Sequence, residues 1–261
     1  MSKKLSRTNF NLSADIPNQM KEIYEQNPME LFSNRNFRHS IALARLEGVS
    51  KDNIEVAKDV DPGAIDNVIE YNLEMLTKMR NHQQTFGRPS ILINALVCIQ
   101  YIRLNAPDLK VLCIGPRTEA EFFHFMGEGF AAPNLTGLDL MSYSEFVDVG
   151  DMHYMPYDDD TFDIVFVGWT LTYSKEIQRV ADECIRVAKP GAYVAVGVES
   201  DGKNTKGELY NYTLTDAINI LETSEITDLF EGHIHSVPFR HEVHRSMRDT
   251  HDMVMVIIEL N

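Results

Sequence analysis

Apolar residues in the second half of the chain fall into short runs that alternate with helical stretches. Such runs are typical of buried strands. They cover residues 110–114, 135–139, 146–149, 162–167, 192–198, 234–243 and 252–260. Helical patterns over 118–127 and after Ser174, a candidate N-cap, separate some of these strands. Strands that alternate with helices predict an α/β fold with a doubly wound, mostly parallel sheet of seven strands.

The first half of the chain has a helical pattern instead. Apolar positions between Ile65 and Met79 share one face of a helix. A further helix is predicted from Pro89, and its residues 91–101 are apolar nearly all round, which predicts burial. We predict two parts: a helical lid over residues 1–88, and the α/β domain over residues 89–261.

The charge of the chain limits its partners. Lys and Arg number 24 against 39 Asp and Glu, a net charge of −15, which disfavours nucleic acid and anionic membrane surfaces. No apolar run approaches the roughly 20 residues of a membrane helix, and polar residues occupy the place of a leader's apolar stretch. Three cysteines inside apolar runs are interpreted as buried, reduced thiols. We expect a cytoplasmic protein.

In a doubly wound sheet, ligands bind beyond the carboxyl ends of the strands. The first strand is followed by the segment from Gly115 to Glu119, which has one glycine where a dinucleotide dehydrogenase would have G-x-G-x-x-G. An ordinary turn is the alternative interpretation. Asp139 follows the second strand, and its two oxygens suit a ribose diol. A helix cap or a solvated aspartate is the alternative there.

The third and fourth strands also end in candidate binding residues. Asp151 can accept a hydrogen bond from a purine amine, while Met152 packs on the purine face. The fourth strand ends at Gly168, followed by the aromatic side chains of Trp169 and Tyr173. Core packing beneath a helix is the alternative interpretation for these aromatic residues.

Two motifs in this half resemble those of the class I S-adenosylmethionine-dependent methyltransferases. The run Gly150-Asp151-Met152 through Met155-Pro156-Tyr157 to Phe162-Asp163-Ile164-Val165 is similar to the family's D-a-x-x-L-P-F-x-D-x-S-F-D-x-V signature. The run 186–192, RVAKPGA, is similar to its R-V-L-K-P-G-G turn. The resemblance implies a seven-stranded Rossmann-like methyltransferase sheet. It also implies S-adenosylmethionine as cofactor and S-adenosylhomocysteine as product.

The resemblance assigns cofactor contacts to matching positions. They are Gly115 and Pro116 at the methionine part, Asp139 at the ribose, Leu140, Asp151 and Met152 around the adenine, and Gly168 and Trp169 near the sulfonium. The first motif departs from the family, which has an acidic residue and several glycines there. We therefore hypothesise that Arg117 pairs with the cofactor's carboxylate and Glu119 with its ammonium.

Methyl transfer needs a closed pocket and, for some acceptors, a base. Candidate catalytic residues are His153, Tyr173 and Glu199. Candidate substrate contacts from the lid side are His82 and Arg88, together with Tyr173. The alternatives are a surface histidine at 153, an ion pair at Glu199 and catalysis by proximity without a base.

The resemblance, together with Arg88, implies a methyltransferase that acts on a small polar molecule, by O-methylation of a sugar, a phosphorylated compound or another metabolite. A non-catalytic cofactor-binding or scaffold protein is the alternative, while a dehydrogenase lacks its glycine motif. His233 and His235 share a strand face, but without a carboxylate or cysteine cluster beside them we predict no metal. Exposed helical faces in residues 1–90 allow a homodimer.

Overall fold

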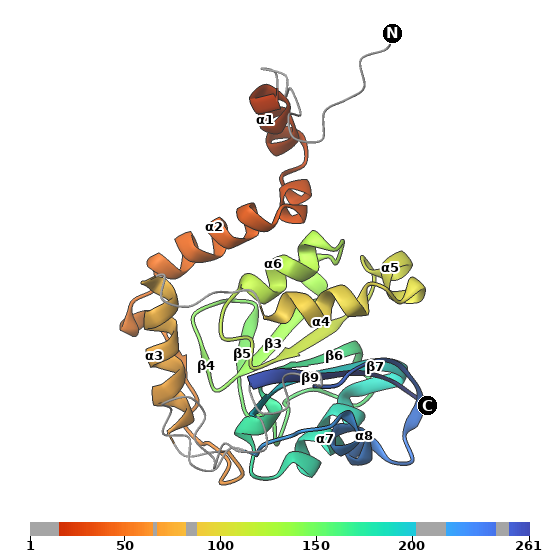
Figure 1. The fold of residues 1–261 in the computed structure, drawn as a ribbon. Coiled ribbons are helices and arrows are strands. Elements are labelled where there is room, and N and C mark those ends of the chain that lie inside the picture. The colour runs from red at the N-terminus through yellow and green to blue at the C-terminus, as the bar shows by residue number, and fades with distance from the viewer. Residues whose placement is uncertain (1–15, 65–66, 82–87, 202–217, 244–250) are drawn as a thin grey trace.

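Seven strands form one mixed sheet in the computed structural model, which describes residues 16–64, 67–81, 88–201, 218–243 and 251–261 (Figure 1). Its spatial order is β5-β3-β2-β6-β7-β9-β8. The strands are β2 (Val111–Ile114), β3 (Leu135–Asp139), β5 (Val147–Val149), β6 (Phe162–Gly168), β7 (Ala188–Asp201), β8 (Ile234–His241) and β9 (His251–Leu260). All seven predicted strands are present, which confirms the predicted fold class.

The first five of these strands are parallel, and the last two are antiparallel to their neighbours. Strand β2 lies at the centre, with Cys113 opposite Gly137 of β3 on one side and Phe166 of β6 on the other. All four β2 residues are buried, because both faces of the sheet are covered.

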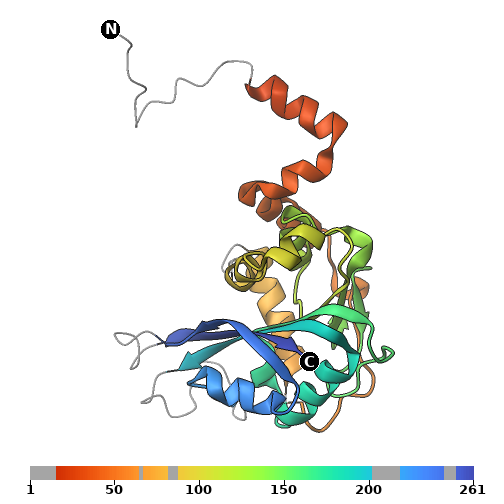
Figure 2. The same ribbon diagram turned by 90° about the vertical axis from the view of Figure 1, so that its right-hand side faces the viewer.

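Helices cover the two faces of the sheet (Figures 1 and 2). On one side lie α4 (Pro89–Leu96), α5 (Gln100–Asn105) and α6 (Ala120–Gly127), over a core that includes Cys113 and Phe166. On the other lie α7 (Ile177–Val187) and α8 (Thr223–Thr227), over a core that includes Ile114 and Val167. Short 3₁₀ turns join these elements at η3 (Ala132–Asn134), η4 (Leu171–Tyr173) and η5 (Asp228–Phe230).

The N-terminal region begins with α1 (Ile16–Gln26), η1 (Pro28–Ser33) and α2 (Arg35–Glu47), and α1 lies well away from the sheet (Figure 1). After η2 (Lys51–Asn53), strand β1 (Glu55–Val56) pairs antiparallel with β4 (Met141–Ser142). Helix α3 (Val68–Arg80) then packs Val68 against Leu140 and Tyr173, beyond the ends of β3 and β6. The small sheet, which no pattern predicted, ties this region to the α/β domain. The boundary at residue 88 stays a prediction.

Three local predictions are wrong. The helix from Pro89 is not continuous or buried all round: α4 ends at Leu96, and Tyr101 beyond the break is 55% exposed. Cys98, at that break, is exposed rather than buried. Ser174 does not cap α7, which begins three residues later. Its hydroxyl instead accepts a hydrogen bond from the Glu176 amide at 2.8 Å.

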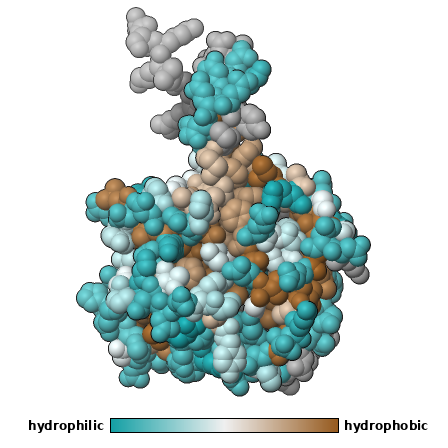
Figure 3. Space-filling model, turned by 180° about the vertical axis from the view of Figure 1, so that it is seen from behind, coloured by the Kyte–Doolittle hydropathy of each residue, from teal (hydrophilic) through white to brown (hydrophobic). Residues whose placement is uncertain are grey.

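The surface seen from behind is mainly hydrophilic, with apolar patches scattered over it (Figure 3). Within the described ranges, no helix is both long and apolar enough to cross a membrane.

Candidate functional site

The chain order of the strands reverses beside β2, since β3 lies on one side of it and β6 on the other. Ligands of doubly wound sheets bind at such a switch point, beyond the carboxyl ends of the strands. The segments that follow β2, β3 and β6 therefore define the candidate site. They contain most of the predicted cofactor contacts.

Gly115 sits in the tightest part of this region. Its φ is +71°, and a Cβ at this position would overlap the side chain of Thr170. Thr170 in turn donates a hydrogen bond from its Oγ1 to the Ile114 carbonyl at 2.9 Å. Trp169, between Gly168 and Thr170, has a left-handed φ of +62°, which is uncommon for an aromatic residue. The close approach of the two strand ends explains why glycine is required at 115.

Asp139 ends β3 as a buried carboxyl, 7% exposed. Its Oδ1 accepts a hydrogen bond from the Met141 amide at 3.2 Å. Burial raises the pKa of Asp139 to about 6, although backbone hydrogen bonds and the charge of Arg117 act in the opposite direction. The carboxylate form is thus the main form at neutral pH, as a ribose contact requires.

A second buried acid, Glu121 of α6, was not predicted. It is 6% exposed and takes a hydrogen bond from the Cys113 thiol of β2. Its Oε2 lies 3.4 Å from the position that a Cβ on Gly168 would occupy, so the carboxyl reaches the end of β6. Among the described residues, Glu121 Oε1 and the indole Nε1 of Trp169 have no hydrogen-bond partner. We call Cys113, Glu121, Asp139 and Trp169 the glutamate cluster.

Trp169 itself packs its ring against Gly197 of β7, where a Cβ would lie 3.3 Å from the indole. It belongs to the core beneath α4, and 9% of it is exposed. The packing that the sequence left as an alternative is therefore present. A contact of Trp169 with the cofactor stays a prediction.

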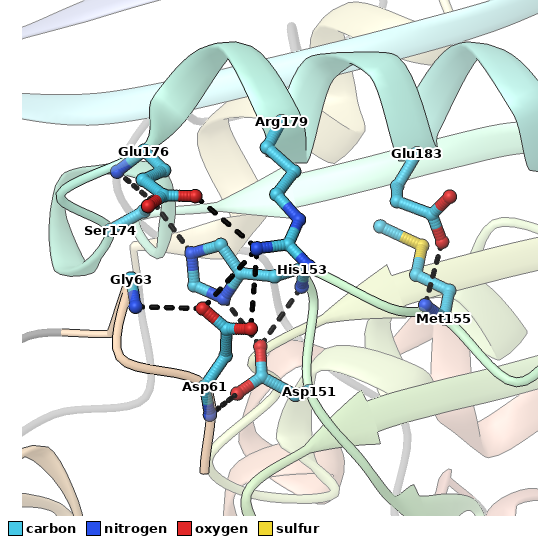
Figure 4. Close-up of polar contacts among 9 residues, drawn as sticks. All are labelled: Asp61, Gly63, Asp151, His153, Met155, Ser174, Glu176, Arg179 and Glu183. Atoms are coloured by element: carbon cyan, nitrogen blue, oxygen red, sulfur yellow. Dashed lines mark hydrogen bonds and ion pairs between the residues drawn. The ribbon is translucent and has the colours of Figure 1, made fainter.

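Asp151, His153 and Ser174 form a chain of hydrogen bonds on the α7 side (Figure 4). Nδ1 of His153 lies 2.5 Å from Oδ1 of Asp151, and Nε2 lies 2.7 Å from the Ser174 hydroxyl. His153 is 1% exposed. Burial alone raises the pKa of Asp151, but hydrogen bonds from His153 and from the Asp61 amide outweigh it and lower that pKa. Both ring nitrogens are engaged, so the geometry favours a positioning role for His153 over that of a base.

Asp61 extends this chain toward the segment before α3. Its amide donates to Oδ2 of Asp151 at 2.9 Å, and its own Oδ1 accepts from the Gly63 amide at 2.7 Å (Figure 4). Arg179 of α7 pairs with Asp61 at 3.2 Å and stacks on Tyr154, its guanidinium carbon 3.7 Å from the ring centroid. The histidine cluster, which we define as Asp61, Asp151, His153 and Ser174, thus fastens the base of α3 to the α/β domain.

Glu119 is also engaged within the protein. It is 1% exposed, and its carboxylate accepts hydrogen bonds from Arg45 of α2 at 2.7 Å and from the Ser144 hydroxyl at 2.6 Å. A bidentate arginine leaves little acceptor capacity on a carboxylate. The pairing of Glu119 with the cofactor's ammonium stays a prediction, which these bonds disfavour.

Arg117 and Tyr173 both contact Tyr71 of α3. The Arg117 guanidinium lies over the Tyr71 ring at 5.4 Å, and its Nε donates to Asn72 Oδ1 at 3.0 Å. Tyr173 makes an edge-to-face contact with Tyr71, with ring centroids 6.0 Å apart. Two predicted site residues from separate strand ends are therefore brought together beneath α3.

Arg88 and Glu199 form an ion pair at the end of β7. Their side chains are 51% and 21% exposed, so the pair lies partly in solvent. The ion pair that the sequence left as an alternative for Glu199 is present. It neutralises the positive charge with which Arg88 was expected to bind an anionic substrate. His82, the other predicted contact from the lid, lies outside the described residues.

Residues 128–196 match the family model of the methyltransferase domain. A 1,6-didemethyltoxoflavin-N1-methyltransferase from Burkholderia thailandensis, solved with its substrate and S-adenosylhomocysteine, has 13% identity and a TM-score of 0.54. It covers 80% of this chain and 95% of its own. The [4+2]-cyclase SpnF also has 13% identity and a TM-score of 0.54, with 78% and 98% covered. No curated protein matches the chain.

The matched residues and the strand order show a methyltransferase domain with the Rossmann-like fold of the class I S-adenosylmethionine-dependent methyltransferases. At 13% identity, the two structural likenesses bear on the fold. One of the two is a cyclase, so the likeness of fold does not set the reaction or the substrate.

Sequence reasoning missed several residues around the site: Asp61, Tyr71, Asn72, Glu121 and Ser174. A signal was present for Glu121, since it precedes Phe125 by four residues and so shares the buried face of its helix. An acid on an apolar helix stripe is rare unless it is paired. The others depend on contacts between distant segments, which no local pattern encodes.

Proposed function

We propose that this methyltransferase transfers the methyl group of S-adenosylmethionine to a small polar metabolite. The observation that carries the proposal is the set of buried polar groups at the switch point. A carboxyl ends β3, and the carboxyl of Glu121 reaches the end of β6. Buried acids are costly unless they are paired or bind something. A nucleoside with a charged amino-acid tail is a ligand that would use both.

The residues present fit this cofactor at several points. Asp139 offers carboxylate oxygens for a ribose diol, and the half-buried Leu140 and Met152 are apolar candidates for adenine contacts. Gly115 allows the end of β2 to approach Thr170 closely, and Gly168 leaves room for the Glu121 carboxyl. Arg117, held over Tyr71, offers a cation for the cofactor's carboxylate. Asp151 holds the adenine-side loop through its bonds to His153 and Asp61.

The bound cofactor would supply an activated methyl group, and the protein would supply orientation and a dry site. Helix α3 contributes Tyr71 and Asn72 above the strand ends, next to Tyr173. We assign Tyr173 to orienting the acceptor and the Arg88–Glu199 pair to contacting polar groups of the substrate. His153 would keep the base of α3 in place.

The acceptor we propose is a hydroxyl of a sugar, a phosphorylated compound or a similar metabolite. The half-buried Tyr173 and Glu199 are the groups that would contact and polarise such a hydroxyl. The net charge of −15 disfavours a nucleic-acid substrate.

Two measurements test the proposal. Trp169 is the sole tryptophan of the chain, so its fluorescence should change saturably when S-adenosylhomocysteine is added, with matching heat in calorimetry. Incubation with S-adenosylmethionine and a panel of hydroxyl-bearing metabolites should then release S-adenosylhomocysteine only when an acceptor is present. Absence of both fluorescence change and heat would refute cofactor binding.

A non-catalytic role is the second candidate. It is favoured by the first motif, where Glu119 is committed to Arg45 and Ser144. Saturable cofactor binding without acceptor-dependent turnover across the panel would support this candidate instead.

A further inference from the structure

The most unusual polar group in the described part of the chain is the carboxyl of Glu121. Its Oε1 is buried and has no hydrogen-bond partner among the described residues. An unpartnered buried oxygen loses its hydration without compensation. A protein keeps such a group at a cost in stability, and a bound ligand is one way in which the cost is recovered.

The position of this carboxyl is informative. It hydrogen-bonds the Cys113 thiol at the end of β2 and lies against Gly168 at the end of β6. These two strands flank the switch point, where ligands of this fold class bind. The unpartnered indole Nε1 of Trp169, the next residue after Gly168, lies at the same strand end.

The charged and titratable groups around Glu121 indicate which kind of ligand it would bind. The titratable groups that act on Glu121 are the Cys113 thiol and the Asp139 carboxyl, and neither brings a positive charge. Burial and Asp139 raise the pKa of Glu121 to about 8, against the effect of the Cys113 hydrogen bond. Burial also raises the pKa of Cys113, which stays a neutral thiol. Among the residues that the structure describes, none supplies this carboxyl with a cation that has N–H donors.

Resting on the proposed function, we infer that Glu121 binds the α-ammonium of the cofactor's methionine part and ionises when it does so. Glu119, two residues earlier, was the residue expected in this role, but Arg45 and Ser144 already occupy its carboxylate. On binding at neutral pH, the Glu121 proton passes to the solvent, and the ammonium keeps its own protons.

The inference is tested by calorimetry on the full chain with two ligands. S-adenosylhomocysteine carries the ammonium, while 5′-deoxy-5′-methylthioadenosine lacks the amino-acid part. The Glu121→Gln variant should bind the first about 10- to 100-fold more weakly, the range of a charge-assisted hydrogen bond, and the second as the wild type does. Glu231→Gln, an exposed position, is the charge-matched control and should bind both ligands as the wild type does.

Proton release separates an ammonium contact from a purely structural effect. Titration in buffers of different ionisation enthalpy should show about one proton released per S-adenosylhomocysteine bound at pH 7 in the wild type, and nearly none in Glu121→Gln. Unchanged affinity in Glu121→Gln, equal weakening for both ligands, or undiminished proton release would overturn the inference. If the wild type binds neither ligand, the proposed function itself fails, which is a distinct result.

Discussion

The histidine cluster and the glutamate cluster lie at the same edge of the sheet but differ in how completely their polar groups are paired. In the histidine cluster, both nitrogens of His153 have partners and Asp151 accepts bonds from two segments. In the glutamate cluster, a carboxylate oxygen and an indole nitrogen have none among the described residues. The first arrangement is what a structural joint requires, and the second is what a binding site requires before its ligand arrives.

The pH dependence of stability is the most direct test of whether the Glu121 carboxyl lacks a charged partner. The pKa of Glu121 is raised from 4.5 to about 8 in the folded protein, so between these values the folded state binds more protons than the unfolded state. Its contribution to the free energy of unfolding therefore falls as pH rises through that window. We expect the stability of Glu121→Gln relative to wild type to rise by about 4 kcal/mol between pH 4 and pH 9.

Urea denaturation at several pH values measures this difference, and comparison with the wild type cancels the other titrating groups. The Glu231→Gln control should keep a constant difference from wild type. A constant difference for Glu121→Gln as well would mean that the carboxyl already has a charged partner, and the contrast between the two clusters would be lost.

The second prediction concerns the paired cluster. Replacing His153 by Ala leaves the Asp151 carboxylate and the Ser174 hydroxyl without their partner and opens a cavity beside Gly63. We expect a loss of about 3 kcal/mol in the free energy of unfolding. His235→Ala, at an exposed position of β8, should stay within about 0.5 kcal/mol of wild type.

The same variant tests what the paired cluster does. Because the cluster fastens the base of α3, limited proteolysis of His153→Ala should cut near residues 57–64 sooner than in wild type. A variant as stable as wild type would show that the observed bonds contribute nothing, and then pairing would not distinguish the two clusters.

The third prediction sharpens the assignment of Asp139. In the proposed site its carboxylate accepts hydrogen bonds from the ribose diol, so binding would require the ionised form, and the pKa in the free protein is raised to about 6. Affinity for 5′-deoxy-5′-methylthioadenosine should therefore be constant above pH 7 and fall as pH drops, about tenfold between pH 7 and pH 5. This ligand lacks the ammonium, so Glu121 does not contribute to the profile. A flat profile down to pH 5, or the same fall in Asp139→Asn, would remove Asp139 from the ribose site.

The sheet was predictable from the sequence because its strands are short apolar runs. A strand that is buried on both faces shows such a run whichever strands lie beside it. The same logic placed Gly115, Asp139 and Gly168 at neighbouring strand ends, as found. Pairing between distant segments was not predictable. Arg45 reaches Glu119 across 74 residues, and Asp61 reaches Asp151 across 90.

The difference between Glu119 and Glu121 shows the limit most clearly. Both acids stand near the start of α6, and the charges of the first motif predicted Glu119 as the ammonium partner. The decisive information is which carboxylate is already occupied, and that depends on α2, a helix from another part of the chain. Whether a polar group has a hydrogen-bond partner depends on the folded structure, whereas the period of apolar residues is visible in the sequence.

An exposed pair gives the smallest expected effect and a reference for the two buried clusters. Arg88 and Glu199 are in contact, but the Arg88 side chain is 51% exposed, so water screens the pair and side-chain entropy opposes it. A double-mutant cycle of Arg88→Gln and Glu199→Gln should give a coupling energy of about 0.5 kcal/mol in urea denaturation, decreasing with added salt. The cycle cancels what each residue does separately. A coupling above about 2 kcal/mol would mean that the pair is shielded from solvent in the folded protein, as the buried clusters are. The Arg88–Glu199 pair would then not differ in burial from the histidine cluster and the glutamate cluster. Arg88 would also be held too firmly to turn toward a substrate.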